Sequence, residues 1–344
     1  MPRLKRYLPL VLISVVGLAT YFTLAKELFS FGLGNIFSTL SRAAAPLLVA
    51  AIAVRASTAF LEGLVFASSS RAVGQGLRVP DAYRGICAAL AMEYVLPVGG
   101  LTELYKVFFC IRRGYKLHEA VQIMFVHRTS VCSGLALMTF IALSLLPMNS
   151  WLKLAIYGSI GALMATNILG ISMFRSRGIV SRVGGLAKKV YERFLRSVVP
   201  VDIDSLTSFR PNPLRMRFVV LAFTIATVEH LAIAFSGFLA SMSIGVALSF
   251  IQSILVFDVI QSILWLLPAI TPGSVGVLET FQLLALKGIG MSGAAAAIPL
   301  AYRIVVMASM MPQLIPMFIK DVSEFLKTVE AKKSLGTSTA SVAL

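Results

Sequence analysis

The sequence predicts an all-α polytopic membrane protein, with about six full transmembrane helices and two broken re-entrant hairpins arranged as an inverted repeat. Of its 344 residues, 58% are hydrophobic and only 13% are charged. A soluble domain has roughly 45–50% apolar and about 25% charged residues. Several apolar runs also reach the roughly 20 residues that a bilayer core requires. Two of these runs are interrupted near the middle by proline and glycine.

Eight apolar runs divide the chain. The first follows a basic N-terminus and resembles a signal peptide, but it lacks a small-residue cleavage site, so we interpret it as an uncleaved first transmembrane helix. Six runs are expected to cross the membrane, and the two interrupted runs are expected to enter it and return. The runs fall at about 8–25, 45–69, 85–111, 120–147, 152–174, 218–240, 245–287 and 294–319.

The basic residues support this division. The segment 175–217 contains ten Lys and Arg residues, and further basic clusters follow the second, third and last apolar runs. These clusters all lie on one side of the membrane only if 85–111 and 245–287 do not cross. The positive-inside rule then places these loops and both termini in the cytoplasm, with the chain in the cell membrane. The alternative is two ordinary Pro-kinked spans in each interrupted region.

The resulting organisation has two membrane halves. Residues 1–174 form the first, and residues 218–325 form the second, inverted half. Between them, the basic cytoplasmic loop 175–217 has apolar residues at helical spacing over 181–199, which predicts an amphipathic helix on the membrane surface. The small, polar residues of 326–344 predict a disordered tail.

Each half contains the same polar pattern of helix breakers, a carboxylate and then an arginine inside the next span. Glu103 precedes Arg128 by 25 residues, and Glu279 precedes Arg303 by 24. Free N–H groups at a broken helix end and a nearby arginine suit a phosphate. One interpretation is that the arginines bind an anionic headgroup while the glutamates hold them or the hairpin tips; the other is purely structural ion pairing. The expected hairpin-tip residues are Pro97, Gly99, Gly100, Pro272, Gly273 and Gly276.

Further ionisable residues lie inside apolar runs, where a charge costs about 2.5–3.5 kcal/mol on insertion scales. They should therefore pair or line a wet cavity. Arg55 and Glu62 share one face of the second span, and Asp258 is expected to pair with an arginine. Glu229 and His230 are either a proton relay or a polar pair at a helix interface. The expected supporting residues are Arg55, Glu62, Glu93, Glu229, His230 and Asp258.

Other functional classes have weaker signals. The net charge of +16 sits beside apolar runs, which favours anionic lipids over nucleic acid. The three cysteines and three histidines show no metal-ligand spacing, and no nucleotide-binding motif occurs, so we expect no metal, no cofactor and no ATP. An enzyme is not expected, although His127 and Glu103 could form an acid–base pair acting on a lipid phosphate. A small-solute or ion transporter also stays open, as does an oligomer.

Two stretches resemble a known family. VLPVGGLTELYKVFFCIRRGYKLHEAVQIMFVHRTS and TPGSVGVLETFQLLALKGIGMSGAAAAIPLAYRIV are similar to the two signature regions of the flippase-like transmembrane domain of lysylphosphatidylglycerol synthases. The likeness extends over about residues 8–325. In the first region, Thr102 and Lys106 stand where the family usually has glycine and arginine, while Glu103 is kept. The second region matches at Pro272, Gly273, Gly276, Val277, Glu279, Tyr302 and Arg303.

The resemblance implies movement of a phospholipid, an aminoacylated phospholipid or a polyprenyl-phosphate-linked sugar between leaflets. Lys106, His127 and Tyr302 are also expected among the headgroup-binding residues, beside the two glutamates and two arginines. The chain ends about 20 residues after its last span, so a stand-alone member without the transferase domain is expected.

Overall fold

The computed structural model describes residues 33–95, 101–173, 213–260, 276–291 and 296–340, and over these ranges it contains helices and no strand. The predicted all-α class is confirmed. The helices are α2 (Leu33–Ser41), α3 (Ala45–Ala72), α4 (Val79–Val95), α5 (Leu101–Arg112), α6 (Leu117–Leu145), α7 (Ser150–Met173), α10 (Met216–Ser243), α11 (Phe250–Ser253), η1 (Ile254–Val259), α13 (Val277–Gly288) and α14 (Ile298–Ala340).

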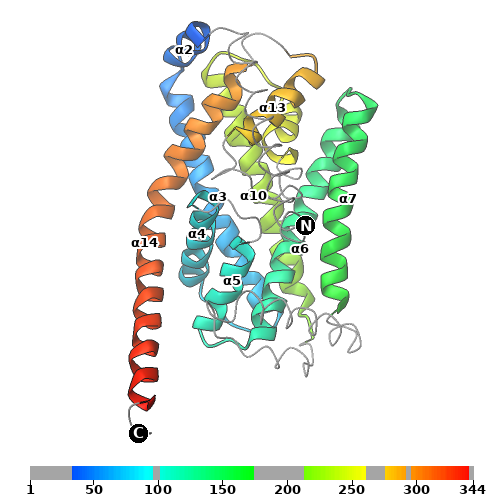
Figure 1. Ribbon diagram of the computed structural model, residues 1–344. Helices are drawn as coiled ribbons and strands as arrows, with labels where there is room; N and C mark the ends of the chain where they lie inside the picture. Colours follow the sequence, from blue (N-terminus) through cyan, green and yellow to red (C-terminus); the bar gives the residue numbers. More distant parts are fainter. Residues whose placement is uncertain (1–32, 96–100, 174–212, 261–275, 292–295, 341–344) are drawn as a thin grey trace, which may run out of the picture.

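Four of these helices are long and apolar enough to cross a membrane: α3, α6, α10 and residues Ile298–Asp321 of α14. With 28 residues each, α3 and α10 are about 42 Å long, which exceeds the hydrocarbon core of about 30 Å. The four coincide with predicted spans. The expected span 152–174 coincides with α7, which packs along α6 (Figure 1), and the expected span 8–25 lies outside the described residues.

The distribution of side chains is that of a membrane protein. Large apolar side chains face outwards on all the long helices, as Trp151 on α7, Phe140 on α6 and Ile319 on α14 do. Charged side chains, in contrast, are buried between helices, as for Lys106 and Asp258. Hydrocarbon accepts the outward apolar surface, and the bundle interior is where ionisable groups within a membrane can find partners.

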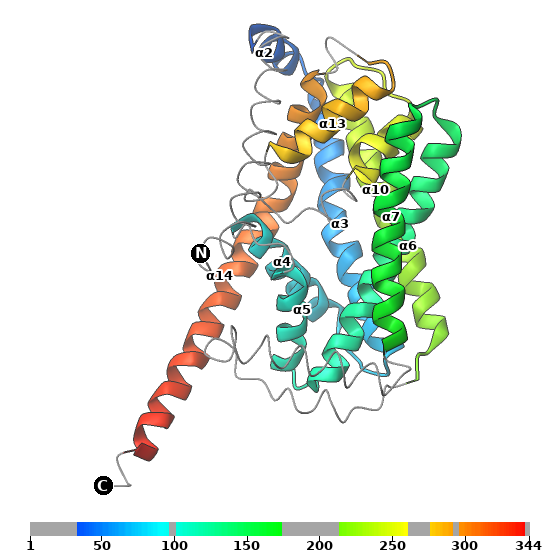
Figure 2. The same ribbon diagram turned by 45° about the vertical axis from the view of Figure 1, so that its right-hand side comes forward.

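The first interrupted region folds as α4 and α5, which pack against each other. They have 17 and 12 residues, about 26 Å and 18 Å, so each is shorter than the bilayer core. Helix α4 begins at Val79 rather than at the expected boundary of 85, because Pro80 and Asp81 both suit a first helical turn. Both helices lie toward the end of the bundle opposite α2 (Figures 1 and 2).

The second interrupted region has the opposite placement. Helix α11 continues into η1, a six-residue π-helix, and α13 follows with 12 residues. These elements lie toward the end of the bundle that carries α2 (Figure 2). The tips expected at 96–100 and 261–275 lie outside the described residues, so the re-entrant path itself stays a prediction.

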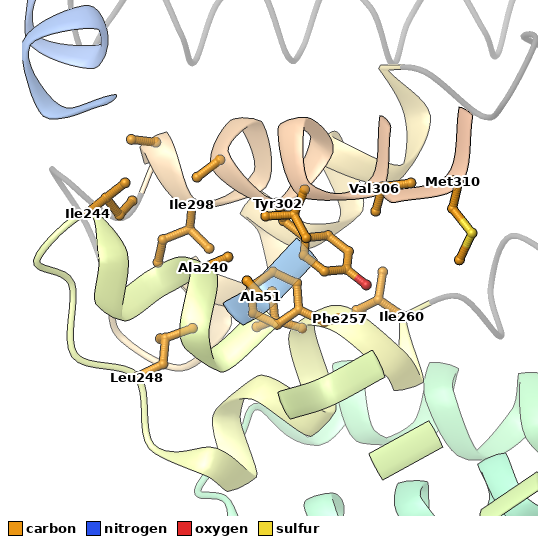
Figure 3. Packing of buried hydrophobic residues seen from close by; sticks show 14 of the residues in the cluster. Ala51, Ala240, Ile244, Leu248, Phe257, Ile260, Ile298, Tyr302, Val306 and Met310 are labelled. Atoms are coloured by element: carbon orange, nitrogen blue, oxygen red, sulfur yellow. The ribbon is translucent and has the colours of Figure 1, made fainter. Parts of the chain in front are cut away.

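Close helix packing joins the second region to the bundle. Tyr302 on α14 packs against Phe257 of η1, with ring centroids 4.5 Å apart (Figure 3). A Cβ atom at Gly237 of α10 would lie 2.0 Å from the Phe257 ring, so only glycine lets η1 approach this closely. Small residues at crossings are the usual means of packing helices within a membrane.

The C-terminal segment differs from its prediction. Residues 326–344 were expected to be disordered, but α14 continues to Ala340. The amphipathic helix expected at 181–199 lies outside the described residues.

Candidate functional site

Charged side chains from three helices meet beside α5. Lys106 Nζ lies 3.2 Å from Glu62 Oε1 of α3 and 3.8 Å from Glu103 Oε2. Arg128 Nη1 of α6 lies 2.7 Å from Glu103 Oε1. Together with His127, these four residues are called the α5 network below. It brings together the predicted headgroup-binding residues of α5 and α6 and the predicted supporting residue Glu62 of α3.

Local sequence explains how α5 contributes two of these groups. Glu103 stands in the first turn of the helix, where the helix dipole stabilises a carboxylate. Lys106 follows three residues later, on the same helix face. The lysine side chain is only 4% exposed, so it needs its two carboxylate neighbours to be tolerated there.

His127 lies deeper than the rest of the α5 network. Its side chain is 2% exposed, and its ring packs edge-on against Phe66. The ring Nε2 lies 3.8 Å from Glu62 Oε1, and neither ring nitrogen has a hydrogen-bond partner among the described residues. The carboxylate that faces this histidine is that of Glu62 on α3, rather than that of the expected acid–base partner Glu103.

The second polar group forms where α13 begins. Gly276 has φ +83°, a left-handed conformation that glycine adopts without steric cost. Its N–H donates to Glu279 Oε2 at 2.7 Å, and Arg303 Nε of α14 donates to Glu279 Oε1. The Glu279 side chain is 4% exposed and both of its oxygens are occupied. This carboxylate thus caps α13 and fixes α14 to it.

Both carboxylate–arginine pairs expected from the sequence are formed. In each, a glutamate in the first turn of a short helix meets an arginine on the next long helix. The pairs differ in exposure: Arg128 and Glu103 are 28% and 21% exposed, whereas Arg303 and Glu279 are 13% and 4% exposed. The Arg128 pair is the more accessible of the two.

A third polar group ties η1 to the bundle. His230 Nδ1 of α10 lies 2.6 Å from Asp258 Oδ1, and its Nε2 lies 3.0 Å from the carbonyl oxygen of Val131 on α6. The two ring nitrogens thus face oxygen atoms of two different elements, and His230 links η1 and α6 to α10. The expected arginine partner of Asp258 is wrong, because η1 packs on α10 and presents the carboxylate to this histidine.

Other predicted residues have different surroundings. Arg55 donates to Thr58 Oγ1, not to Glu62. Glu229 is 6% exposed, and no described residue donates a hydrogen bond to its Oε2. Tyr302 is packed in the hydrophobic cluster of Figure 3, and its hydroxyl has no hydrogen-bond partner among the described residues. Glu93 lies on α4.

The five remaining tip residues lie outside the described part of the chain, and only Gly276 of that set is placed. The residues outside are Pro97, Gly99, Gly100, Pro272 and Gly273.

One ionic cluster was not predicted from the sequence. Asp321 of α14 is 2% exposed and lies 2.7 Å from Arg84 Nη2 of α4 and 3.5 Å from Arg112 Nη1 of α5. Nearby, Tyr83 donates to Gln313 Oε1 at 2.7 Å. The partners are more than 200 residues apart, and nothing in the local sequence around Asp321 signals them.

The described residues contain no group of three or more His, Cys, Asp or Glu side chains that could hold a metal ion. Cys87, Cys110 and Cys132 are buried and free.

Comparison with protein families identifies the chain's family. A model described as the lysylphosphatidylglycerol synthase TM region matches residues 9–311. The chain belongs to this family. The match spans both carboxylate–arginine pairs and identifies a membrane protein related to lipids. A search of curated proteins gave no significant match to this chain.

Proposed function

We propose that this protein moves an anionic or modified phospholipid, or a polyprenyl-phosphate-linked lipid, between leaflets without ATP. The observation that carries the proposal is the pair of carboxylate–arginine contacts, Glu103–Arg128 and Glu279–Arg303, at the starts of two short helices. Membership of a lipid-related family supports the same function. The role is transport, with no chemical change of the lipid.

The α5 network suggests how a headgroup is held. A phosphate can replace Glu103 as the partner of Arg128, which is partly exposed. Lys106 stays beside Glu62 at 3.2 Å, so no buried cation loses its counter-charge in the exchange. This matters because leaving one member of a buried pair alone costs about 3–5 kcal/mol. The lipid tails stay against the outward apolar faces of the long helices.

We also propose that the two short-helix regions are re-entrant and enter from opposite leaflets. The placement of α4 and α5 toward one end, and of η1 and α13 toward the other, supports this arrangement (Figure 2). Arg71, Arg113 and Lys116 lie at or just beyond helix ends on the α4–α5 side. By the positive-inside rule we propose that this side is cytoplasmic and that both termini lie in the cytoplasm, as expected from the sequence.

Leaflet exchange of a headgroup-labelled anionic phospholipid in proteoliposomes tests the function. Wild type should exchange the lipid, and the Arg128→Ala, Arg303→Ala double variant should lose exchange by about tenfold or more, since one lost interaction of 1.4 kcal/mol is worth a factor of ten. Arg113→Ala is the matched control, because Arg113 forms a more exposed pair with Asp81. Unchanged exchange in a folded double variant would contradict the proposal.

A further inference from the structure

Two consecutive residues of α10 connect polar groups that are otherwise separate. Glu229 interacts electrostatically with Arg55 and Glu62 of α3 and with Lys106 of α5. His230 binds Asp258 of η1 instead. Successive residues of a helix point about 100° apart, so α10 presents one residue to the α5 network and the next to the second short-helix region.

One carboxylate oxygen of Glu229 has no hydrogen-bond donor within the described part of the chain. Its side chain is more than nine-tenths buried, and no described residue donates to Oε2. A buried ionised carboxylate without a donor is costly, whereas its protonated form carries a donor of its own and no charge. The geometry therefore favours a carboxyl group that binds and releases a proton.

Glu62 strengthens this preference. It already accepts from Lys106 and faces His127, and it interacts electrostatically with Glu229 across the α3–α10 contact. Two carboxylates in one buried environment resist being ionised together, so the pair readily holds one proton. Lys106 supplies one positive charge to this pair, and Arg55 supplies the other.

The charged groups on the other elements packed against α10 have partners elsewhere. On α6, Arg128 pairs with Glu103, and His127 faces Glu62. On η1, Asp258 pairs with His230. On α14, Arg303 pairs with Glu279. Within the described chain, the charge that faces Glu229 is thus set by Arg55, Glu62, Lys106 and His230.

We propose that Glu229, together with Glu62, forms a proton-binding site that couples headgroup movement to proton movement across the membrane. This inference rests on the proposed function. The Glu229 carboxylate takes up one proton from one compartment and becomes a neutral carboxylic acid. It returns that proton to the other compartment and regains its negative charge. Each cycle therefore moves one proton and consumes no other reactant.

The coupling follows from the shared cation. Lys106 interacts with Glu62, Glu103 and Glu229. When Glu229 is neutral, Lys106 has one carboxylate fewer to balance, and the α5 network gains positive charge where Arg128 holds a phosphate. When the proton leaves, the restored negative charge weakens that binding. Proton uptake thus favours the headgroup-bound state, and proton release favours headgroup departure.

A proton fits this site better than a metal cation. Hard divalent cations such as Ca²⁺ and Mg²⁺ take about six or more oxygen ligands. The described residues around Glu229 supply two carboxylates beside two cations, and they include no metal-binding cluster of three or more acidic, His or Cys side chains. A pH gradient is accordingly the driving force to test first.

Lipid exchange is measured in proteoliposomes with and without a pH gradient, using a headgroup-labelled anionic phospholipid. In wild type, the gradient should accelerate exchange several-fold in one direction. In Glu229→Gln the rates with and without the gradient should become equal. Asp81→Asn, which changes a more exposed carboxylate in the same way, should keep the wild-type ratio.

The outcomes separate the two proposals. Wild-type exchange that ignores the gradient, or a Glu229→Gln protein that still responds to it, overturns the proton site and leaves the lipid transporter intact. Absence of exchange under every condition overturns the transporter itself. If Glu229→Gln does not fold, Glu62→Gln replaces it and should reduce the response to the gradient.

Infrared difference spectroscopy gives a test that needs no transport. Purified wild-type protein is titrated from acidic to alkaline buffer. It should lose the infrared band of a protonated carboxyl group, at a frequency that burial separates from the bands of surface carboxyl groups. Asp81→Asn should retain the band, and Glu229→Gln should lack it. A wild-type spectrum without such a band, or a band that persists in Glu229→Gln, would reject the site.

Discussion

Arg128 on α6 and Glu103 on α5 form an ion pair of 2.7 Å in which both side chains keep partial exposure. The corresponding pair of Arg303 and Glu279 is more deeply buried, and its carboxylate also binds the N–H of Gly276. The two pairs share a sequence pattern but differ in surroundings. The first suits an exchangeable headgroup contact, and the second suits a permanent fastening of α13 to α14.

This difference should appear in stability. Glu279→Gln leaves the buried Arg303 charge without its counter-charge, so we expect it to lower the free energy of unfolding by about 3–5 kcal/mol. Glu103→Gln should cost less, because its partner is more exposed. Unfolding by denaturant in bicelles measures both values. A larger loss at Glu103 would contradict the assignment of the Glu279 pair as the structural one.

Gly276 should be sensitive for a backbone reason. Gly276→Ala places a Cβ atom on a residue with φ +83° and should destabilise the protein by about 1–2 kcal/mol. Gly158→Ala on α7 is the control, because its Cβ would meet nothing within 4 Å, and it should gain about 0.5–1 kcal/mol. Thermal unfolding of both variants gives the comparison. Equal midpoints would argue against a strained start of α13.

The contact between Gly237 and Phe257 predicts strong coupling. Gly237→Ala forces the Phe257 ring to move and should cost about 1–3 kcal/mol. Phe257→Ala alone should cost about 3–5 kcal/mol through the cavity that it leaves. In the double variant the added methyl group occupies part of that cavity, so the loss should be smaller than the sum of the two. An additive double-mutant cycle would mean that η1 does not pack on α10 as Figure 3 shows.

Asp321 should hold the α4–α5 region to α14. Asp321→Asn removes the counter-charge of both Arg84 and Arg112 and should cost about 3 kcal/mol or more. Asp81→Asn breaks a more exposed pair and should cost about 1 kcal/mol or less. Hydrogen exchange resolves the effect by segment, with faster exchange expected in α4 and α5. Unchanged exchange there would show that other contacts suffice.

Much of the fold was readable from the sequence. Four of the predicted spans coincide with helices long enough to cross a membrane, because a bilayer imposes length and apolarity on each helix separately. The two carboxylate–arginine pairs were also readable, because each joins a short helix to the next long helix along the chain. The C-terminal segment was expected to be disordered, whereas α14 continues to Ala340.

The sequence by itself determined which residues had to find partners, since ionisable groups in apolar runs cannot stay alone in a membrane. The tertiary structure determined which residues those partners are. His127 faces Glu62, and Asp258 binds His230. Asp321 lies between two arginines from helices that are far away in the sequence. Helical spacing fixes only which residues share a face of one helix. The partner across an interface depends on how two helices cross, and that is set by packing contacts such as Gly237 against Phe257.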